Sequence, residues 1–280
     1  MSGESKLTDW IGRKEQTQDQ VSLRQAVGMA AMFDLEAKPV AGDPLPPGWH
    51  WMLFPEIARH SVLSRDGHAP RGGFLPPVEL PRRMWGGNRL KFHGEIKVGE
   101  EIGRESEVLS VKEKDGRSGQ LTLVTVKHSY FASEGLALEE EHDIVYRSAA
   151  EDGNKSPPGE TPTARPKWSQ AIDPEPVFLF RYSALTFNGH RIHYDMPYVT
   201  NVEGYPGLIV HGPLTATLLL ELVRRELPER SIQTAVVRAR RPLFSGDSFK
   251  VEGFPSASGA HTWAVDPQGF IAMTLDVIFD

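Results

Sequence analysis

The sequence contains no cysteine, and this absence removes several kinds of chemistry. A disulfide framework, a thiolate-bound metal and a cysteine nucleophile all require that residue. Long apolar segments are also absent, since the longest, around Leu214 to Val223, falls far short of the roughly 20 residues that a membrane-spanning helix needs. The first 20 residues have no apolar core and carry Glu4, Asp9, Glu15 and Asp19. We therefore expect neither a secretory signal nor a transit peptide, and a cytoplasmic location.

The chain has fewer basic than acidic residues. Lysine and arginine number 31 against 37 acidic residues, a net charge of −6, so we expect neither nucleic acid nor an anionic membrane as a partner. The hydrophobic fraction of 39% and the charged fraction of 24% are those of a folded globular protein. A chain of 280 residues is long enough for two domains of ordinary size.

One polar segment divides the chain. Ser148 to Pro166 is rich in proline and has almost no large apolar residue to bury. It predicts an N-terminal domain at 1–148, a linker at 149–166 and a C-terminal domain at 167–280. The two parts share a weak echo, because residues 88–100 and 237–247 both read as a basic strand that ends in a Gly-acid turn. A duplicated unit would explain this echo.

Strand patterns follow each of these turns. Apolar and β-branched residues recur between short turns, which predicts antiparallel strands at 101–111, 121–132 and 137–147, and at 248–254, 261–265 and 270–279. Two helices are predicted before them. Residues 21–35 are amphipathic, whereas 213–227 are apolar around most of the helix and begin with a proline. A helix that apolar is wrapped by other structure. The combination predicts an α+β fold of the hotdog type.

The densest polar cluster lies just before the apolar helix. Asn188, His190, His193 and Asp195 fall within eight residues, and His211-Gly212 stands at the start of the helix. A helix N-terminus offers free N–H groups and the positive end of the helix dipole. Because Pro213 has no N–H, the Gly212 amide is the natural donor for a thioester oxygen that becomes enolate-like.

Each of these residues also has a purely structural interpretation. His193 has the alternative of a satisfied loop histidine and Asn188 that of a turn-forming asparagine, with the functional interpretation preferred for both. Asp195 either orients His193 or caps the next turn. Gly212 either admits a ligand or allows tight packing.

The cluster resembles the motif of the MaoC-like hydratases, Asp-x-Asn-Pro-Ile-His, which is followed about 20 residues later by His-Gly at the hotdog helix. In this alignment Asn188 stands at the Asp position, His190 at the Asn, Arg191 at the Pro and His193 at the His. The catalytic histidine is present, and the usual carboxylate is replaced by an amide. An amide orients water but cannot deprotonate it.

Longer stretches resemble the type 2 hydroxyacyl-thioester dehydratase branch of that family, which includes bacterial itaconyl-CoA and mesaconyl-C4-CoA hydratases. They are residues 42–54, 71–90, 181–195 and 203–214. The resemblance implies a double hotdog, with a degenerate N-terminal half that has lost its long helix and a catalytic C-terminal half. It implies a hydro-lyase that adds water reversibly to a short enoyl-CoA, with no cofactor besides the coenzyme A thioester of the substrate and no metal. We expect a homo-oligomer, a dimer.

In this interpretation His193 is the general base in hydration and the acid in dehydration, with a pKa near the ordinary value of about 6.5. Asn188 holds the water and Gly212 stabilises the oxyanion. Arg181 and Arg191 flank the motif and are expected to pair with the distal carboxylate of a C5 dicarboxylic acyl group. The remaining expected substrate contacts are His190, Tyr194 and His211.

Other features leave alternatives open. The basic residues Arg238, Arg240 and Arg241 either contact coenzyme A phosphates or protect a strand edge, with the second preferred. The glycine pairs in 71–74 and 85–88 are interpreted as hairpin turns, and 49–51 as part of the core or of an interface. The alternative functions are a 3-hydroxyacyl-ACP or -CoA dehydratase of fatty-acid synthesis and a non-catalytic acyl-thioester-binding protein. A thioesterase is disfavoured because the motif loop has no carboxylate at the expected position.

Overall fold

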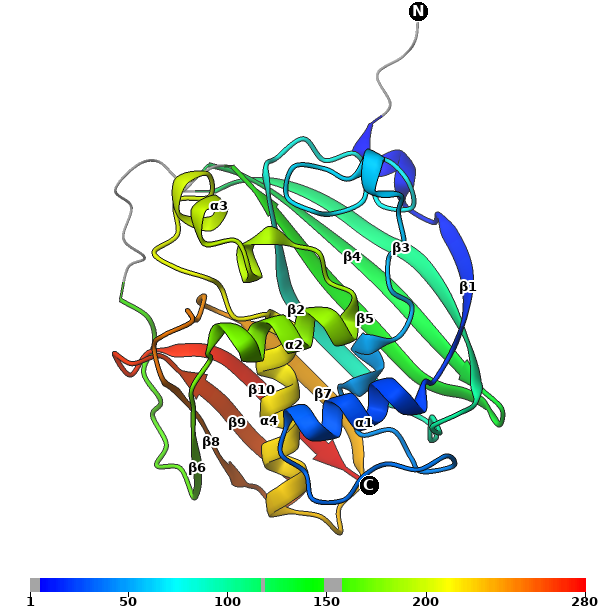
Figure 1. The fold of residues 1–280 in the computed structure, drawn as a ribbon, viewed down its shortest axis with the longest axis vertical. Helices are drawn as coiled ribbons and strands as arrows, with labels where there is room; N and C mark the ends of the chain where they lie inside the picture. Colours follow the sequence, from blue (N-terminus) through cyan, green and yellow to red (C-terminus); the bar gives the residue numbers. More distant parts are fainter. Residues whose placement is uncertain (1–5, 117–118, 149–157) are drawn as a thin grey trace, which may run out of the picture.

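The computed structural model describes residues 6–116, 119–148 and 158–280, which form one continuous antiparallel sheet of ten strands (Figure 1). The strand order is β1-β3-β4-β5-β2-β7-β10-β9-β8-β6. The N-terminal half contains η1 (Leu7–Trp10), β1 (Lys14–Gln20), α1 (Leu23–Met32), η2 (Trp49–Met52), η3 (His60–Val62), β2 (Arg82–Phe92), β3 (Glu101–Gly116), β4 (Gly119–Ala132) and β5 (Gly135–Arg147). The C-terminal half contains β6 (Trp168–Ile172), α2 (Pro176–Thr186), η4 (Arg191–His193), α3 (Met196–Asn201), α4 (Gly212–Glu226), β7 (Ile232–Ala239), β8 (Phe249–Pro255), β9 (Gly259–Val265) and β10 (Ile271–Phe279). The η elements are short 3₁₀ helices.

The two halves repeat one topology. From the outer edge inward the order is β1-β3-β4-β5-β2 in the first half and β6-β8-β9-β10-β7 in the second. They join where β2 pairs with β7, in the register Gly87↔Arg238 to Lys91↔Thr234. The turn glycines of the sequence echo, Gly99 and Gly246, have φ of +95° and +91°. The predicted α+β double hotdog is confirmed.

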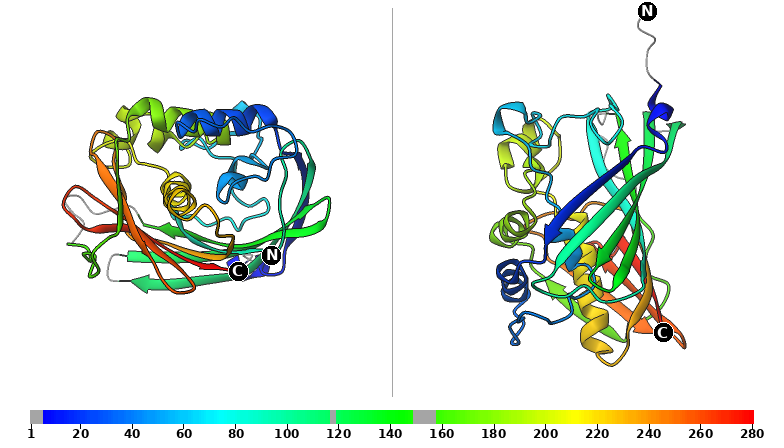
Figure 2. Two further views of the ribbon diagram at one scale, coloured as in Figure 1. Left: turned by 90° about the horizontal axis from the view of Figure 1, so that it is seen from below. Right: turned by 90° about the vertical axis from the view of Figure 1, so that its right-hand side faces the viewer.

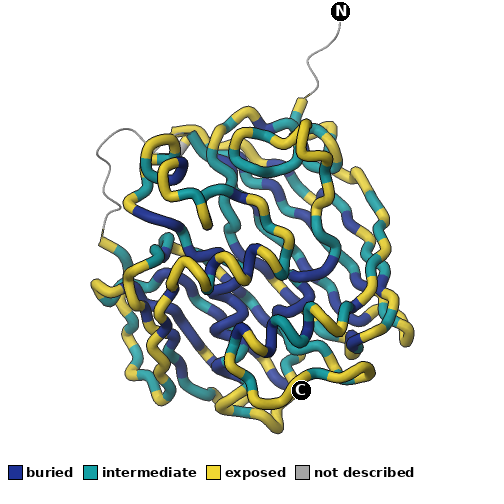
Figure 3. Tube along the Cα trace, in the orientation of Figure 1, coloured by how far each residue is buried: buried dark blue, intermediate teal, exposed yellow. Residues whose placement is uncertain are grey.

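The sheet curls around one long helix. Figure 2 shows α4 inside the hollow of the sheet, with α1 and α2 forming a layer over the open side. Nine of the fifteen residues of α4 are buried. The helix is therefore surrounded by other structure, as its apolar sequence predicted. Buried residues concentrate at the centre of the molecule, around α4 and the strands behind it (Figure 3).

The N-terminal half has the short helix η2 where the other half has α4. Its Trp51 donates Nε1–H to Glu140 Oε1 at 2.9 Å, and the Tyr130 hydroxyl donates to Glu140 Oε2 at 2.7 Å. The Asn88 amide also donates to this buried carboxylate. Trp49 donates Nε1–H to Glu221 of α4 at 3.0 Å. The segment 49–51 is therefore core, as predicted, and it ties the two halves together.

Most predicted elements are confirmed, with ends shifted by a few residues. The strands β3 to β5 and β8 to β10 and the helices α1 and α4 occupy the predicted segments. The strands β1 and β6 and the helix α2 were not predicted. The hairpin predicted at 85–88 is wrong, because Trp85 to Asn88 lie inside β2, where the register shifts between Trp85 and Gly87.

The predicted linker lies partly outside the described residues, at 149–157. Its described part, 158–166, has no helix or strand but packs along the sheet, where Ile271 N donates to the Glu160 carbonyl at 2.7 Å. Among the described residues, the helices are too short or too polar to cross a bilayer.

Candidate active site

The motif loop leaves α2 through a left-handed residue. Phe187 ends the helix with φ of +53°, and Asn188 N then donates to the Ser183 carbonyl at 2.8 Å. The side-chain oxygen of Asn188 accepts from His190 N at 3.0 Å. This is the turn-forming role foreseen for asparagine, and it uses only the oxygen. The amide Nδ2 keeps its two hydrogens for another acceptor.

His193 is buried and held by the backbone. Its Nδ1 lies 2.7 Å from the Ile209 carbonyl oxygen. Because a carbonyl only accepts, Nδ1 carries the ring proton and Nε2 is left with a lone pair. Nε2 forms no hydrogen bond to any residue in the described ranges. The arrangement is that of a neutral imidazole ready to take a proton.

A second histidine stacks on the first. The rings of His193 and His211 are 3.6 Å apart at their centroids, with 18° between their planes. His211 Nε2 lies 2.8 Å from the Ser183 hydroxyl oxygen, and its buried Nδ1 has no partner among the described atoms. Tyr182 packs edge-on against the same ring at 4.9 Å. His211 thus lies in the site, with its ring packed against the face of the His193 ring.

Burial keeps these rings uncharged. It lowers the pKa of His193 to about 3, with the neighbouring imidazole of His190 adding to the effect, and it lowers the pKa of His190 to about 3 as well. Burial holds the pKa of His211 well below its ordinary value. The expectation that His193 titrates near 6.5 is wrong, because that expectation took no account of burial.

Gly212 begins α4 directly against Trp85 of β2. A Cβ at Gly212 would lie 2.7 Å from Trp85 Cε3, so the indole leaves room only for glycine. This supports the tight-packing interpretation of the residue. The first N–H of α4 nevertheless lies at the positive end of a fifteen-residue helix, one residue after His211. Trp85 also packs edge-on against Trp51 at 6.1 Å, so a pair of tryptophans from the N-terminal half packs, through Trp85, against Gly212 of the C-terminal half.

Asp195 does not orient His193. One oxygen caps α3 by accepting from Tyr198 N at 3.0 Å, and the other accepts from Arg191 Nη2 at 2.7 Å. The capping alternative is the one found, and the Ile209 carbonyl orients the histidine instead. Arg191 lies over the Tyr198 ring at 4.1 Å. Its guanidinium is therefore already paired with a carboxylate of this chain.

The remaining predicted residues lie apart from the histidines. Arg181 is exposed on α2, and the exposed Tyr194 donates its hydroxyl to the Gly189 carbonyl at 3.0 Å. Arg238 on β7 and Arg240, just after the end of that strand, are exposed, whereas Val237 is buried, so Arg238 faces outward, away from α4. The edge-protection interpretation is wrong for them, because β7 is the central strand that pairs with β2 and β10. Arg241 pairs with Asp266 at 3.3 Å.

A hollow away from the histidines carries none of this chemistry. Its volume is about 410 Å³, and it opens beside the C-terminal end of α4, lined by residues that include Lys38, Pro46, Trp49 and Arg224.

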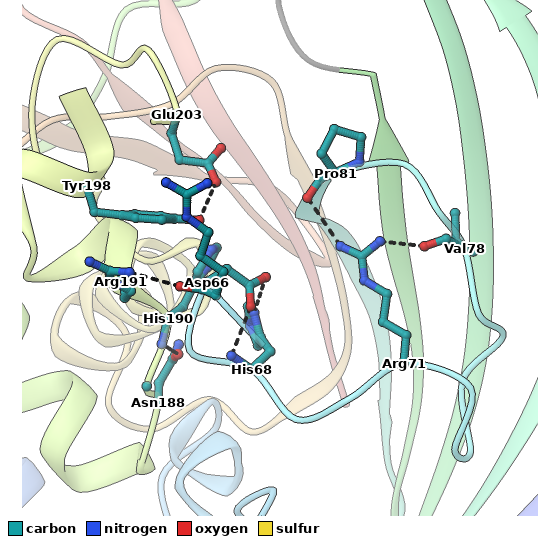
Figure 4. Close-up of polar contacts among 12 residues, drawn as sticks. Asp66, His68, Arg71, Val78, Pro81, Asn188, His190, Arg191, Tyr198 and Glu203 are labelled. Atoms are coloured by element: carbon teal, nitrogen blue, oxygen red, sulfur yellow. Dashed lines mark hydrogen bonds and ion pairs between the residues drawn. The ribbon is translucent and has the colours of Figure 1, made fainter. Parts of the chain in front are cut away.

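The N-terminal half contributes three polar residues that the sequence did not single out. Asp66 and His68 form a hydrogen-bonded pair next to His190, as Figure 4 shows. Arg83 on β2 is half-buried, and its charge adds to the lowering of the pKa of both His190 and His142 that burial mainly causes. These residues are more than 100 positions from the motif, and only the fold brings them to it.

Asp66, His68 and His190 are also close enough to share an ion. One ligand atom from each lies within 4.8 Å of the other two. However, Asp66 Oδ2 and His68 Nδ1 already bond to one another at 3.0 Å, and both would have to turn to the same metal. The geometry is that of an ion pair.

Comparison with known proteins shows the family and the fold. Residues 48–245 match the family model described as hydroxyacyl-thioester dehydratase type 2. The mesaconyl-C(4)-CoA hydratase of Chloroflexus aurantiacus is 44% identical over 269 residues, 96% of each chain. The mitochondrial hydroxyacyl-thioester dehydratase type 2 of Schizosaccharomyces pombe is 31% identical, over 67% of this chain and 69% of its own. A MaoC-like dehydratase from Phytophthora capsici has the same fold, with a TM-score of 0.70 over 98% and 97% of the two chains at 13% identity.

Proposed function

The chain belongs to the hydroxyacyl-thioester dehydratase type 2 family, and we propose that it reversibly hydrates a short dicarboxylic enoyl-CoA of the mesaconyl-C4-CoA kind. Hydro-lyase chemistry on an acyl thioester follows from the family and from the extent of the match to the Chloroflexus hydratase. The choice of coenzyme A over an acyl-carrier protein, and of the acyl group, rests on that relative's name and on the arginine described below.

The observation that carries the mechanism is the hydrogen bond from His193 Nδ1 to the Ile209 carbonyl. It fixes the tautomer that leaves Nε2 as a base, and burial keeps the ring neutral. In hydration, Nε2 takes a proton from water as the water oxygen adds to the β-carbon. Asn188 holds that water through its free amide group.

Negative charge then develops on the thioester oxygen. The Gly212 amide, at the N-terminus of α4, is the donor placed for it, and the helix dipole favours the charge. Trp85 covers the same position and keeps water from it. In dehydration the same groups act in reverse, with the protonated His193 giving its proton to the departing hydroxyl.

Arg83 is the residue that we assign to the distal carboxylate, in place of Arg181 and Arg191. It lies two positions before Trp85 on β2, which puts both side chains on one face of the strand, toward α4. Its guanidinium is half-buried and has no carboxylate partner within the described ranges. An arginine in such a place is suited to a bidentate carboxylate.

We also propose that the two halves have the different roles that the sequence indicated. Residues 167–280 hold the base and the oxyanion donor. Residues 1–148 supply the cover, through Trp85, Arg83 and the segment around Asp66, while the continuous sheet makes them one unit.

The direct test is a panel of enoyl-CoA thioesters, followed by loss of the conjugated thioester absorbance. We expect mesaconyl-C4-CoA or itaconyl-CoA to be hydrated faster than crotonyl-CoA, which has no distal carboxylate. Faster turnover of long-chain substrates would instead favour the alternative of a 3-hydroxyacyl dehydratase of fatty-acid synthesis; the Schizosaccharomyces relative is named a hydroxyacyl-thioester dehydratase.

A further inference from the structure

A loop of the N-terminal half, residues 64–68, is bonded to the histidine motif of the other half. Arg191 N donates to the Asp66 carbonyl at 2.9 Å, and Arg191 Nη1 donates to the Arg65 carbonyl at 3.0 Å. Backbone contacts of this kind fix a position more firmly than contacts between flexible side chains. These hydrogen bonds therefore hold the loop in a fixed position at the site.

The closest approach is between two glycines. Gly67 has φ of +94°, and a Cβ there would lie 2.0 Å from the Gly189 carbonyl oxygen. Only glycine satisfies both the left-handed backbone and the lack of space. The loop thus packs on the motif between Asn188 and His190.

This contact places a carboxylate–imidazole pair at the site. Asp66 Oδ2 lies 3.0 Å from His68 Nδ1, and Asp66 Oδ1 accepts from His68 N at 3.1 Å. Partial burial raises the pKa of Asp66, but the hydrogen bonds and charge of His68 outweigh it and hold that pKa well below the usual range. Asp66 is therefore ionised, so His68 Nδ1 donates the hydrogen and Nε2 remains for other chemistry.

The pair continues into the row of histidines. The ring of His68 lies 4.3 Å from that of His190, which lies 5.4 Å from that of His193. Figure 4 shows Asp66, His68, His190 and Asn188 together, although they come from loops about 120 positions apart. His68 thus packs on the ring of His190, which in turn packs edge-on against His193.

The reaction needs a second proton transfer. Hydration removes one proton from water at the β-carbon and adds one proton to the α-carbon. His193 serves the first, whereas Asn188, which replaces the usual carboxylate of the motif, cannot give or take a proton.

We propose that His68, held by Asp66, is the second acid–base group of this site. In hydration His193 Nε2 accepts the water proton, the oxygen bonds to the β-carbon, and the double-bond electrons move onto the thioester. The charged His68 then gives its Nε2 proton to the α-carbon as the enolate collapses. One proton returned from His193 to His68, past the His190 ring, resets the site. Asp66 is a positioning residue, which stabilises the charged His68. The inference rests on the proposed function.

The test compares His68→Gln and Asp66→Asn with wild type, and with His60→Gln as a matched control. His60 is an exposed histidine of the same half, so its loss should leave the rate unchanged. General acid–base groups contribute about 10²- to 10⁴-fold, and we expect His68→Gln to lower kcat by at least the smaller factor with KM changed less than about threefold. A kcat within about threefold of wild type overturns the inference. An inactive wild type would instead refute the proposed function.

Two further readouts separate chemistry from structure. If His68→Gln lowers the melting temperature, His68→Ala with added imidazole is the substitute, and recovery of rate supports the proposal while its absence contradicts it. Chelator treatment should leave wild-type activity unchanged. Loss that Zn²⁺ restores would show a metal site and overturn the proposal.

Discussion

The imidazole of His193 stacks on that of His211, with centroids 3.6 Å apart and 18° between the planes. Each ring is fixed by its own partner, the Ile209 carbonyl for His193 and the Ser183 hydroxyl for His211. Two positive charges at this separation, both buried, would repel strongly. The stack therefore keeps a pair of neutral rings behind the start of α4, with one ring nitrogen of His193 left for catalysis.

This neutrality predicts an acid-sensitive fold. Burial lowers the pKa of His193 and of His190 to about 3, whereas the unfolded chain takes up these protons near 6.5. Between those values the unfolded state binds more protons, so stability is full above 6.5 and falls as the pH is lowered. We expect the melting temperature to fall between pH 6.5 and about 5, above the range in which carboxylates titrate.

The matched variants are His193→Gln and His261→Gln. His193→Gln removes one buried titrating group. The free energy of unfolding should then depend less steeply on pH, by up to one proton, which is about 1.4 kcal/mol per pH unit. The second removes a half-exposed histidine paired with Asp276 and is the control for loss of a histidine outside the buried cluster. Equal slopes in wild type and His193→Gln would show that His193 titrates normally.

Asn188→Asp should keep hydratase activity within about tenfold. The aspartate retains an oxygen for His190 N, and its second oxygen can hold the water by accepting a hydrogen bond, as the carboxylate of the MaoC-like motif does. Asn188→Ala loses both contacts and should cost more than tenfold. Measured rates that rank alanine above aspartate would remove Asn188 from water binding.

Arg83→Met should separate dicarboxylic from simple substrates. A hydrogen bond to a charged group contributes about 1.5–3 kcal/mol, which is about 10- to 150-fold in kcat/KM for mesaconyl-C4-CoA or itaconyl-CoA. Crotonyl-CoA should change less than about threefold. Arg181→Met, on the exposed face of α2, is the control and should affect neither. Equal losses on both substrates would make Arg83 a structural residue.

Gly212→Ala should impair both folding and catalysis, because the new methyl would lie 2.7 Å from Trp85 Cε3. Overpacking of this kind costs about 1–3 kcal/mol. Gly94→Ala is the control, since the nearest atom to its Cβ would be 3.9 Å away. A Gly212→Ala protein with wild-type melting temperature would mean that Trp85 moves aside freely.

Local patterns predicted much of the fold. Apolar periodicity located α4 and the longer strands, because each buries one face or more. β1 was missed because its sequence, KEQTQDQ, is polar throughout, and its pairing with β3 defines it. The pair Gly86-Gly87 was misread as a turn, since a register shift inside a strand depends on partners far along the chain.

The same limit applies to the site. The segment 187–195 and His211-Gly212 carry a compact local motif, and resemblance assigned them roles. Asp66 and His68 lie on a segment with no local signal, and nothing singled out Arg83 within the stretch 71–90. Only the packing of one half on the other reveals the three residues. Asp195 shows the converse, because a carboxylate two residues from His193 caps α3 and does not touch that histidine.

The central claim is that His193 Nε2 is the base of an enoyl-CoA hydratase. The most direct measurement is the single-turnover rate of mesaconyl-C4-CoA hydration by wild type and His193→Gln at pH 7, followed by loss of conjugated thioester absorbance. We predict a fall of about 10²- to 10⁴-fold, with the melting temperature of the variant kept near that of wild type. A stably folded variant within tenfold of wild type would contradict the account.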